Sequence, residues 1–228
     1  MTAGAWASAR YPVSYDVPRP QRYNRWTVGF RWILAIPQLI LFGGTGFSYF
    51  FTRFGGRSGT FGGYFFGGGV LSAVLGILVF LAWWAIVFTA VFPAGMQGFC
   101  LKLFRWEQNV HAYMALQTDP YPPFSGDEPY PLRLGVEPIA RHNRLTVGFR
   151  LILAIPHFIV LFFLGIAQAI VTVIAWFAIL FTGQYPEGMF TFSVGVSRWS
   201  ARVRAYTLLF VDEYPPFSLE AQPNRGMA

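Results

Sequence analysis

The chain repeats itself, and this internal repeat constrains the fold more than any other feature of the sequence. The segment NRWTVGFRWILAIPQ in the first half returns as NRLTVGFRLILAIPH in the second half. The aligned stretches are Tyr11–Gln38 with Tyr130–His157, and Phe92–Ser125 with Tyr185–Ser218. We therefore expect two tandem copies of one structural unit, over residues 11–125 and 130–218.

The first copy carries an insertion that the second copy lacks. It covers Gly43–Gly69 and is rich in glycine and aromatic residues. This composition disfavours a stable helix, because each glycine costs about 1 kcal/mol in a helix interior. We expect an outer loop whose rings contact lipid or a partner protein, and a loop without any binding role is the alternative. The candidate contact residues are Phe47, Tyr49, Phe50, Phe51, Phe61, Tyr64, Phe65 and Phe66.

Long stretches without charged residues indicate a membrane protein. The 228 residues are 54% hydrophobic and 12% charged, whereas about 25% of a soluble domain is charged. Uncharged apolar runs cover Trp32–Ser48, Val70–Phe92 and Leu151–Thr182. A bilayer-spanning helix needs about 20 residues. The third run therefore predicts two helices joined by a tight turn, and the whole chain predicts four transmembrane helices.

The basic residues predict an orientation for these helices. Two spans in each copy place both termini and the central segment on one side of the membrane. That side holds all of the 17 lysines and arginines except Arg53 and Arg57. The positive-inside rule then predicts cytoplasmic termini, and copies that are parallel, with their axis of pseudo-symmetry along the membrane normal. Because the basic residues flank spans, they argue against a nucleic-acid partner despite an isoelectric point near 9.9.

Each copy ends with an amphipathic segment, Gly95–Gln117 in the first and Gly188–Phe210 in the second. Basic residues mixed with tryptophan and phenylalanine suit a helix that lies among lipid headgroups. We therefore expect two cytoplasmic interfacial helices, and helices packed beneath the bundle are an equally good alternative. The candidate interfacial anchors are Arg105, Trp106, Arg198 and Trp199.

Each copy begins with a short segment in which apolar residues alternate, at positions 13–17 and 132–136. Alternation predicts short strands, which would pair with each other. Their brevity and two prolines, Pro12 and Pro131, count against such a pair. The predicted fold is thus an all-α membrane protein of four transmembrane helices in two parallel repeats, with two interfacial helices and this strand pair as an optional element.

A polar seam runs along the first apolar helix of each copy. Its residues lie two helical turns apart on one face: Asn24, Arg31 and Gln38 in the first copy, and Asn143, Arg150 and His157 in the second. The arginines have three alternative roles. They reach the headgroups, they pair with the carboxylates Asp119 and Asp212, or they line a polar path where the two seams face each other. His157 is also a candidate ligand for haem or a pigment, although its counterpart is a glutamine.

These features resemble the DUF4389 family of bacterial membrane proteins, which is named for having no known function. The resemblance rests on YPVSYDV and YPLRLGV, on the two seam-bearing helices and on the closing YPPFS of both copies. It implies a bacterial cell (inner) membrane location and supplies no catalytic residues.

The sequence contains no recognised catalytic motif. It has no nucleotide-binding glycine loop, no HExxH, no GxSxG and no Cys/His cluster. We expect a non-enzymatic accessory or structural membrane protein without a cofactor, whose partners are membrane lipids and another integral membrane protein. A small transporter or lipid-handling protein that uses the seam, and a haem- or pigment-binding subunit, are the alternatives.

Overall fold

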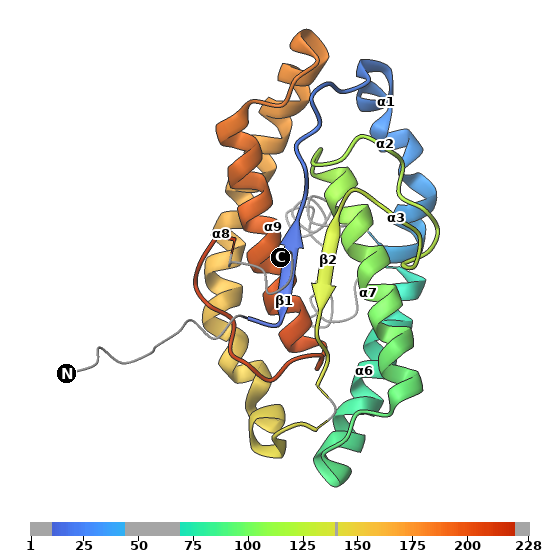
Figure 1. Ribbon diagram of the computed structural model, residues 1–228, viewed down its shortest axis with the longest axis vertical. Coiled ribbons are helices and arrows are strands. Elements are labelled where there is room, and N and C mark those ends of the chain that lie inside the picture. Colours follow the sequence, from blue (N-terminus) through green and yellow to red (C-terminus); the bar gives the residue numbers. More distant parts are fainter. Residues whose placement is uncertain (1–10, 44–68, 140, 222–228) are drawn as a thin grey trace, which may run out of the picture.

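The computed structural model of the protein describes residues 11–43, 69–139 and 141–221. The aromatic residues of the insertion that we expected to contact a partner lie outside these ranges. The described residues form seven helices and two short strands (Figure 1). In the first repeat these are β1 (Val13–Asp16), α1 (Arg25–Gly29), α2 (Arg31–Leu34), α3 (Ile36–Phe42), α6 (Val70–Thr89) and α7 (Ala94–Met114). In the second repeat they are β2 (Arg133–Val136), α8 (Arg144–Thr182) and α9 (Glu187–Thr207).

The apolar run of the second repeat forms one continuous helix, α8, so the expectation of two helices and a tight turn was wrong. Asn143 caps its start by accepting a hydrogen bond from the Leu145 N–H, and Gly183 ends it with a φ of 76°. Over Leu151–Thr182 the run has one glycine, Gly165, and no cluster of residues that favours a turn. Among the described residues, α6 and α8 are the two helices long and apolar enough to cross a membrane.

The first repeat builds the same long helix in pieces, with the insertion between α3 and α6. Gly43 and Gly69 both align with Phe162 of α8. The structure places these two glycines against each other, since a Cβ atom added to Gly69 would lie 2.2 Å from the Gly43 nitrogen. Ser72 Oγ at the start of α6 also donates to the Phe42 carbonyl at the end of α3, at 2.8 Å. The insertion therefore leaves and rejoins the helix at a single point.

The two repeats are related by a pseudo-twofold axis that passes through a small antiparallel sheet. Strand pairing of β1 with β2 is confirmed, and Tyr15 lies opposite Leu134, its own equivalent in the other repeat. The long helices of the two repeats run in opposite directions (Figure 1). Trp83 Nε1 donates to the Val147 carbonyl at 3.2 Å, and the equivalent Trp176 donates to the Val28 carbonyl at 3.0 Å.

The elements form layers that are perpendicular to the shortest axis of the molecule (Figure 1). The sheet lies at the front and packs on α9. Helix α8 lies behind α9, and α6 lies behind α7. Helix α9 is therefore sandwiched between the sheet and α8, and α7 covers α6.

Replacing Gly43–Gly69 by a single phenylalanine should give a folded protein with one continuous helix in each repeat. We expect helical content and thermal stability in mild detergent at least equal to those of the wild type, because a long loop no longer has to be closed. Far-ultraviolet circular dichroism measures both quantities.

The matched control is deletion of Gly43–Gly69 without the phenylalanine. Removing one more residue rotates α6 by about 100° relative to α3 and misplaces its buried stripe. A replacement variant no more stable than this control would contradict the alignment of the two repeats.

Candidate functional site

The buried arginine of the first repeat holds the segment that closes that repeat. Arg31 lies on α2 and only 2% of its surface is exposed. One terminal nitrogen donates to the carbonyls of Tyr113 at 2.7 Å and Thr118 at 3.0 Å. The other donates to Asp119 Oδ1 at 3.3 Å. The guanidinium also lies 4.2 Å from the centre of the Tyr113 ring, which adds a cation–π contact.

The second repeat builds the same arrangement, and we call each of the two an arginine clamp. Arg150 is 1% exposed and donates to the Tyr206 carbonyl at 3.0 Å and to the Asp212 carboxylate. Its guanidinium lies 4.5 Å from the centre of the Tyr206 ring. Each clamp therefore joins the long helix of a repeat to the end of its amphipathic helix and to a closing carboxylate.

The closing carboxylates also cap the long helices. Asp212 Oδ2 accepts from the Asn143 backbone N–H at 2.8 Å, and Asp119 Oδ2 accepts from the Asn24 backbone N–H at 3.2 Å. A negative charge at this position is stabilised by the positive end of the helix dipole. The seam asparagine, the arginine and the carboxylate thus form one connected unit at the start of each long helix.

The surroundings of Asp212 favour its charged form. Burial by itself would raise the pKa of this carboxyl, but hydrogen bonds from His142 and Asn143 and the charge of Arg150 lower the pKa to about 2. His142 Nδ1 lies 2.7 Å from Asp212 Oδ1. The carboxylate is therefore ionised at neutral pH, as a partner for a buried guanidinium requires.

A turn at the end of each amphipathic helix delivers the closing segment to the clamp. Leu116 and Leu209, which are equivalent, have φ values of 61° and 66°. The Gln117 N–H donates to the Ala112 carbonyl at 2.9 Å, which closes a Schellman turn. A left-handed leucine costs about 1 to 2 kcal/mol. Both leucine side chains are buried in the core, and this burial offsets the cost.

The third seam position of each repeat contacts a tryptophan of the amphipathic helix. Trp106 Nε1 donates to Gln38 Oε1 at 2.9 Å, and Gln38 Nε2 donates to the Pro122 carbonyl at 3.1 Å. In the second repeat Trp199 Nε1 donates to His157 Nδ1 at 3.2 Å. Each seam therefore faces the amphipathic helix and closing segment of its own repeat, and the two seams do not meet in the described structure.

The hydrogen bond from Trp199 also decides the chemistry of His157. A neutral imidazole that accepts at Nδ1 carries its proton on Nε2, and a protonated nitrogen does not bind a metal. Phe217 stacks on the ring at 4.0 Å between centroids. Within the described ranges, no group of three or more His, Cys, Asp or Glu side chains is placed to hold a metal ion.

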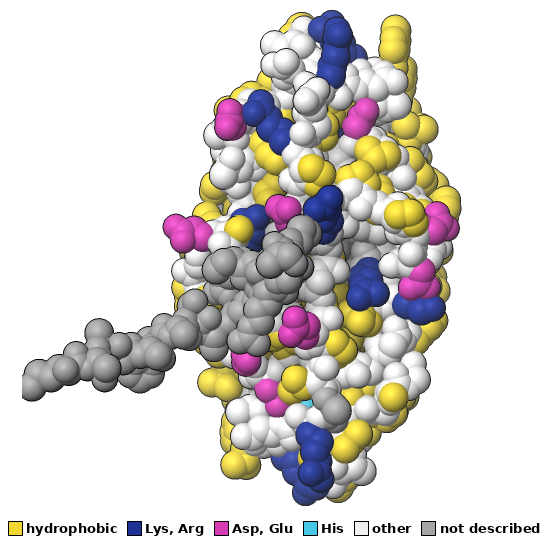
Figure 2. Space-filling model, viewed as in Figure 1, with side chains coloured by type: hydrophobic (Ala, Val, Ile, Leu, Met, Phe, Trp, Pro, Cys, Tyr) yellow, Lys and Arg dark blue, Asp and Glu magenta, His cyan; other side chains and the backbone are white. Residues whose placement is uncertain are grey.

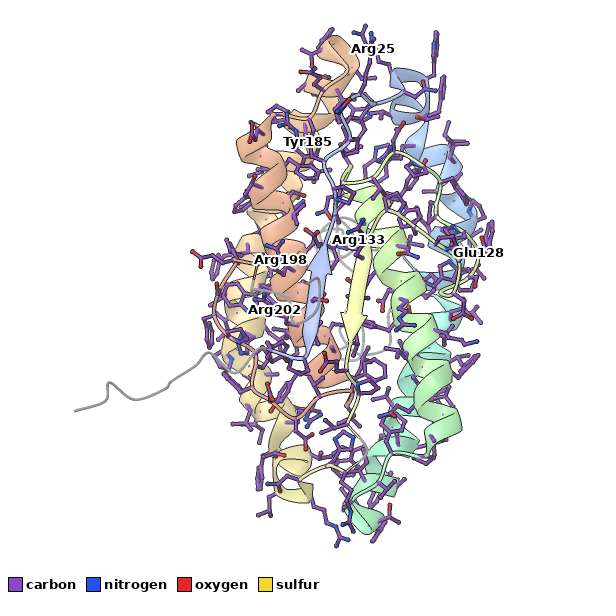
Figure 3. The ribbon with its side chains drawn as sticks, viewed as in Figure 1. Arg25, Glu128, Arg133, Tyr185, Arg198 and Arg202 are labelled. Atoms are coloured by element: carbon purple, nitrogen blue, oxygen red, sulfur yellow. The ribbon has the colours of Figure 1, made fainter. Side chains whose placement is uncertain are left out.

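Of the four residues that were candidate headgroup anchors, the two in the second repeat pack inside the protein, as the alternative of a helix beneath the bundle predicts. Trp199 and Arg198 are buried, whereas Arg105 and Trp106 are half-buried. Arg198 Nε donates to the Tyr15 carbonyl at 2.9 Å and its NH1 donates to the Leu219 carbonyl at 2.9 Å. Figure 3 shows Arg198 and Arg202 beside β1. Periodicity identifies this face of α9, but does not show that the sheet and the closing segment cover it.

A buried polar network joins the two repeats, and residue spacing within one segment does not reveal it. Gln117 accepts from the Tyr15 hydroxyl at 2.7 Å and donates to Ser193 Oγ at 2.9 Å and Ser197 Oγ at 2.7 Å. Gln168 Nε2 also donates to Ser193 Oγ at 2.7 Å. The equivalent positions are apolar, with Phe210 for Gln117. The sequence does carry a signal for this network: its residues are polar in one copy and apolar at the equivalent positions of the other copy.

The long helices present a broad apolar surface outside the clamps. On α8 the buried residues form one stripe that faces α9: Val147, Arg150, Ala154, His157, Gln168, Ala175 and Ile179. Only 11% of the residues in its most apolar window are buried. Exposed apolar side chains extend from Leu145 to Phe181. The core helix of a soluble protein would bury most of these residues.

The fold and these sites define a class of protein: a duplicated helical protein with buried arginine clamps and exposed apolar helices. A family model described as "Domain of unknown function (DUF4389)" matches residues 64–126 and 144–218, one segment in each repeat. Together the matched segments cover more than half of the chain, and the protein belongs to the DUF4389 family, in two tandem copies. Comparison with curated proteins and with solved structures found no match.

A double-mutant cycle on Arg150→Met and Asp212→Asn should show strong coupling. Asp212→Asn should lower the free energy of unfolding by about 3 to 5 kcal/mol, because it leaves the buried Arg150 guanidinium without its carboxylate. Arg150→Met should cost less, because Asp212 is partly exposed and keeps its contacts with His142 and Asn143. The double variant should lose about 1 to 3 kcal/mol less free energy of unfolding than the two single variants lose together. Chemical denaturation in mild detergent, followed by circular dichroism, measures these values.

The control for this cycle is Arg144→Gln, an exposed arginine on the same helix. A surface change of this kind should alter the free energy of unfolding by about 0.5 kcal/mol or less. Additive effects of the two clamp substitutions would show that Arg150 and Asp212 do not depend on each other.

Proposed function

We propose that the protein is a non-enzymatic membrane protein with a structural or accessory role in a bacterial cell membrane. The observation that carries this proposal is the exposed apolar surface of α6 and α8. Leucine, isoleucine and phenylalanine side chains on these helices extend into the surroundings of the protein over the whole length of α8. An apolar surface of this extent is stable when lipid covers it.

The clamps support a structural role for the arginines. Arg31 and Arg150 direct their terminal nitrogens to backbone carbonyls and to the closing carboxylates of their own repeats. These contacts hold the closing segments against the long helices. A transporter that uses the seams would need these polar groups to be available to a passing solute, and the closing segments cover them.

The insertion Gly43–Gly69 is the region that we assign to contact with another membrane protein. Because it leaves and rejoins the helix at one point, its sequence can serve a partner without changing the packing of α3 and α6. The folded variant with phenylalanine in place of the insertion provides the comparison. Mild solubilisation should recover a stable partner with the wild type and less of it with this variant, and equal recovery would remove this part of the proposal.

Charges introduced on the apolar surface should release the protein from the membrane. The test variant combines Ile159→Arg with Ile170→Arg, both exposed on α8. Each arginine should cost about 3 kcal/mol if its site lies in hydrocarbon. The measurement is the fraction of protein that stays in the membrane pellet after an alkaline carbonate wash.

The matched control introduces the same residues on the opposite face, as Glu128→Arg with Glu137→Arg. Both glutamates are exposed, and Glu128 lies on a loop away from α8 (Figure 3). The control should remain in the pellet. Equal retention of both double variants would show that lipid does not cover the apolar surface of α8.

A further inference from the structure

The orientation of the long helices follows from their length and from the placement of charges. We infer that the protein lies within one leaflet, with α6 and α8 parallel to the membrane plane, and that its partner surface is the acyl and headgroup region of that leaflet. This inference rests on the proposed membrane location, and in it the side of the molecule that carries α6 and α8 meets lipid.

The exposed apolar surface of α8 is too long to cross a bilayer. It extends from Leu145 to Phe181, which is about 55 Å at 1.5 Å per residue. The hydrocarbon core is about 30 Å thick. Placing the whole surface across this core would need a tilt of nearly 60°, whereas transmembrane helices tilt by about 0 to 40°. A helix in the membrane plane has no such length limit.

Basic residues lie at both ends of the long helices. At one end Arg22 and Arg25 are exposed and approach Gly183, which ends α8. At the other end Arg141 and Arg144 are exposed, and Arg141 forms a backbone bridge with Val91 after α6. Figure 2 shows basic side chains at both ends of the molecule. A transmembrane placement would put one pair on each side of the membrane, whereas an in-plane placement puts all four at one headgroup level.

The two broad faces of the molecule differ in polarity. Acidic and basic side chains are spread over the face that carries the sheet (Figure 2). Behind it, α6 has no charged residue, and α8 has Arg144 at its first position and the buried Arg150. The buried stripes of the long helices face the amphipathic helices, so their apolar sides point away from the charged face. This arrangement matches the water side and the lipid side of one leaflet.

The pseudo-twofold axis supports the same orientation. It passes through the pair Tyr15 and Leu134 and relates long helices that run in opposite directions. With these helices in the membrane plane, the axis lies along the membrane normal and both repeats reach the same depth. Arg25 and Arg144, which are equivalent, then lie at one level.

Matched cysteines at the two ends test the orientation. Gly95 of α7 and Gly188 of α9 are equivalent, exposed and surrounded by open space, with nothing within 4 Å of an added Cβ atom. Each is the second residue of its helix, and helices α7 and α9 begin at opposite ends of the molecule (Figure 1). The native Cys100 is a silent background, because it is buried and burial raises the pKa of its thiol to about 11.

The experiment labels the full-length variants Gly95→Cys and Gly188→Cys with a membrane-impermeant maleimide. Sealed membrane vesicles of both orientations are used, and detergent-opened vesicles give full labelling. We expect both cysteines to react from the same side and neither to react from the other. Reaction from opposite sides would overturn the in-plane orientation while leaving the membrane location intact.

Two further results separate this inference from the proposed function. Spin labels on Ile152→Cys and Ile170→Cys, both exposed and five turns apart on one side of α8, should report equal depth in vesicles of phosphatidylcholine and phosphatidylglycerol. A much deeper label at position 170 would indicate a crossing helix and overturn the inference. A wild-type protein that washes off membranes without detergent, or that is a soluble dimer with its apolar face covered by a second copy, would overturn the proposed function as well.

Discussion

The buried guanidinium of each repeat is the group on which the rest of the structure depends. An unpaired charge in a protein interior costs several kcal/mol, so Arg31 and Arg150 require partners that arrive from elsewhere in the chain. Each partner set consists of carbonyls at the end of the amphipathic helix and the carboxylate that follows it. The clamp therefore fixes the direction in which the amphipathic helix returns along the long helix.

The amphipathic helix, packed back along the long helix, covers one stripe of it. The other sides of each long helix stay apolar and uncovered. The two repeats then join through the sheet and the network around Gln117, which reaches Ser193 and Ser197 of the other repeat. The equivalent contact of the second repeat is apolar, with Phe210 at 5.6 Å from Phe104 between ring centroids. The two repeats thus share one fold, and residues that differ between them make the two halves of their interface distinct.

Sequence patterns predicted the repeat, the strand pair and the polar seam, because these depend on residue spacing within one segment. They did not predict the continuous α8, because the division of Leu151–Thr182 assumed that each helix crosses a bilayer. They left open whether Trp199 lies among headgroups or packs beneath the bundle, since periodicity identifies a helical face without showing what packs on it. The meeting of Arg150 with Asp212 was among the alternatives, but only the fold shows the carbonyls that complete the clamp.

The central claim is that the long axis of the molecule lies in the membrane plane. Helices α6, α7, α8 and α9 all run close to this axis (Figure 1), so their orientation dominates the linear dichroism of the protein. Polarised attenuated-total-reflection infrared spectroscopy of the protein in aligned bilayers measures it directly. The account predicts an amide I dichroism typical of helices that lie parallel to the bilayer. A dichroism typical of helices aligned with the membrane normal would contradict it.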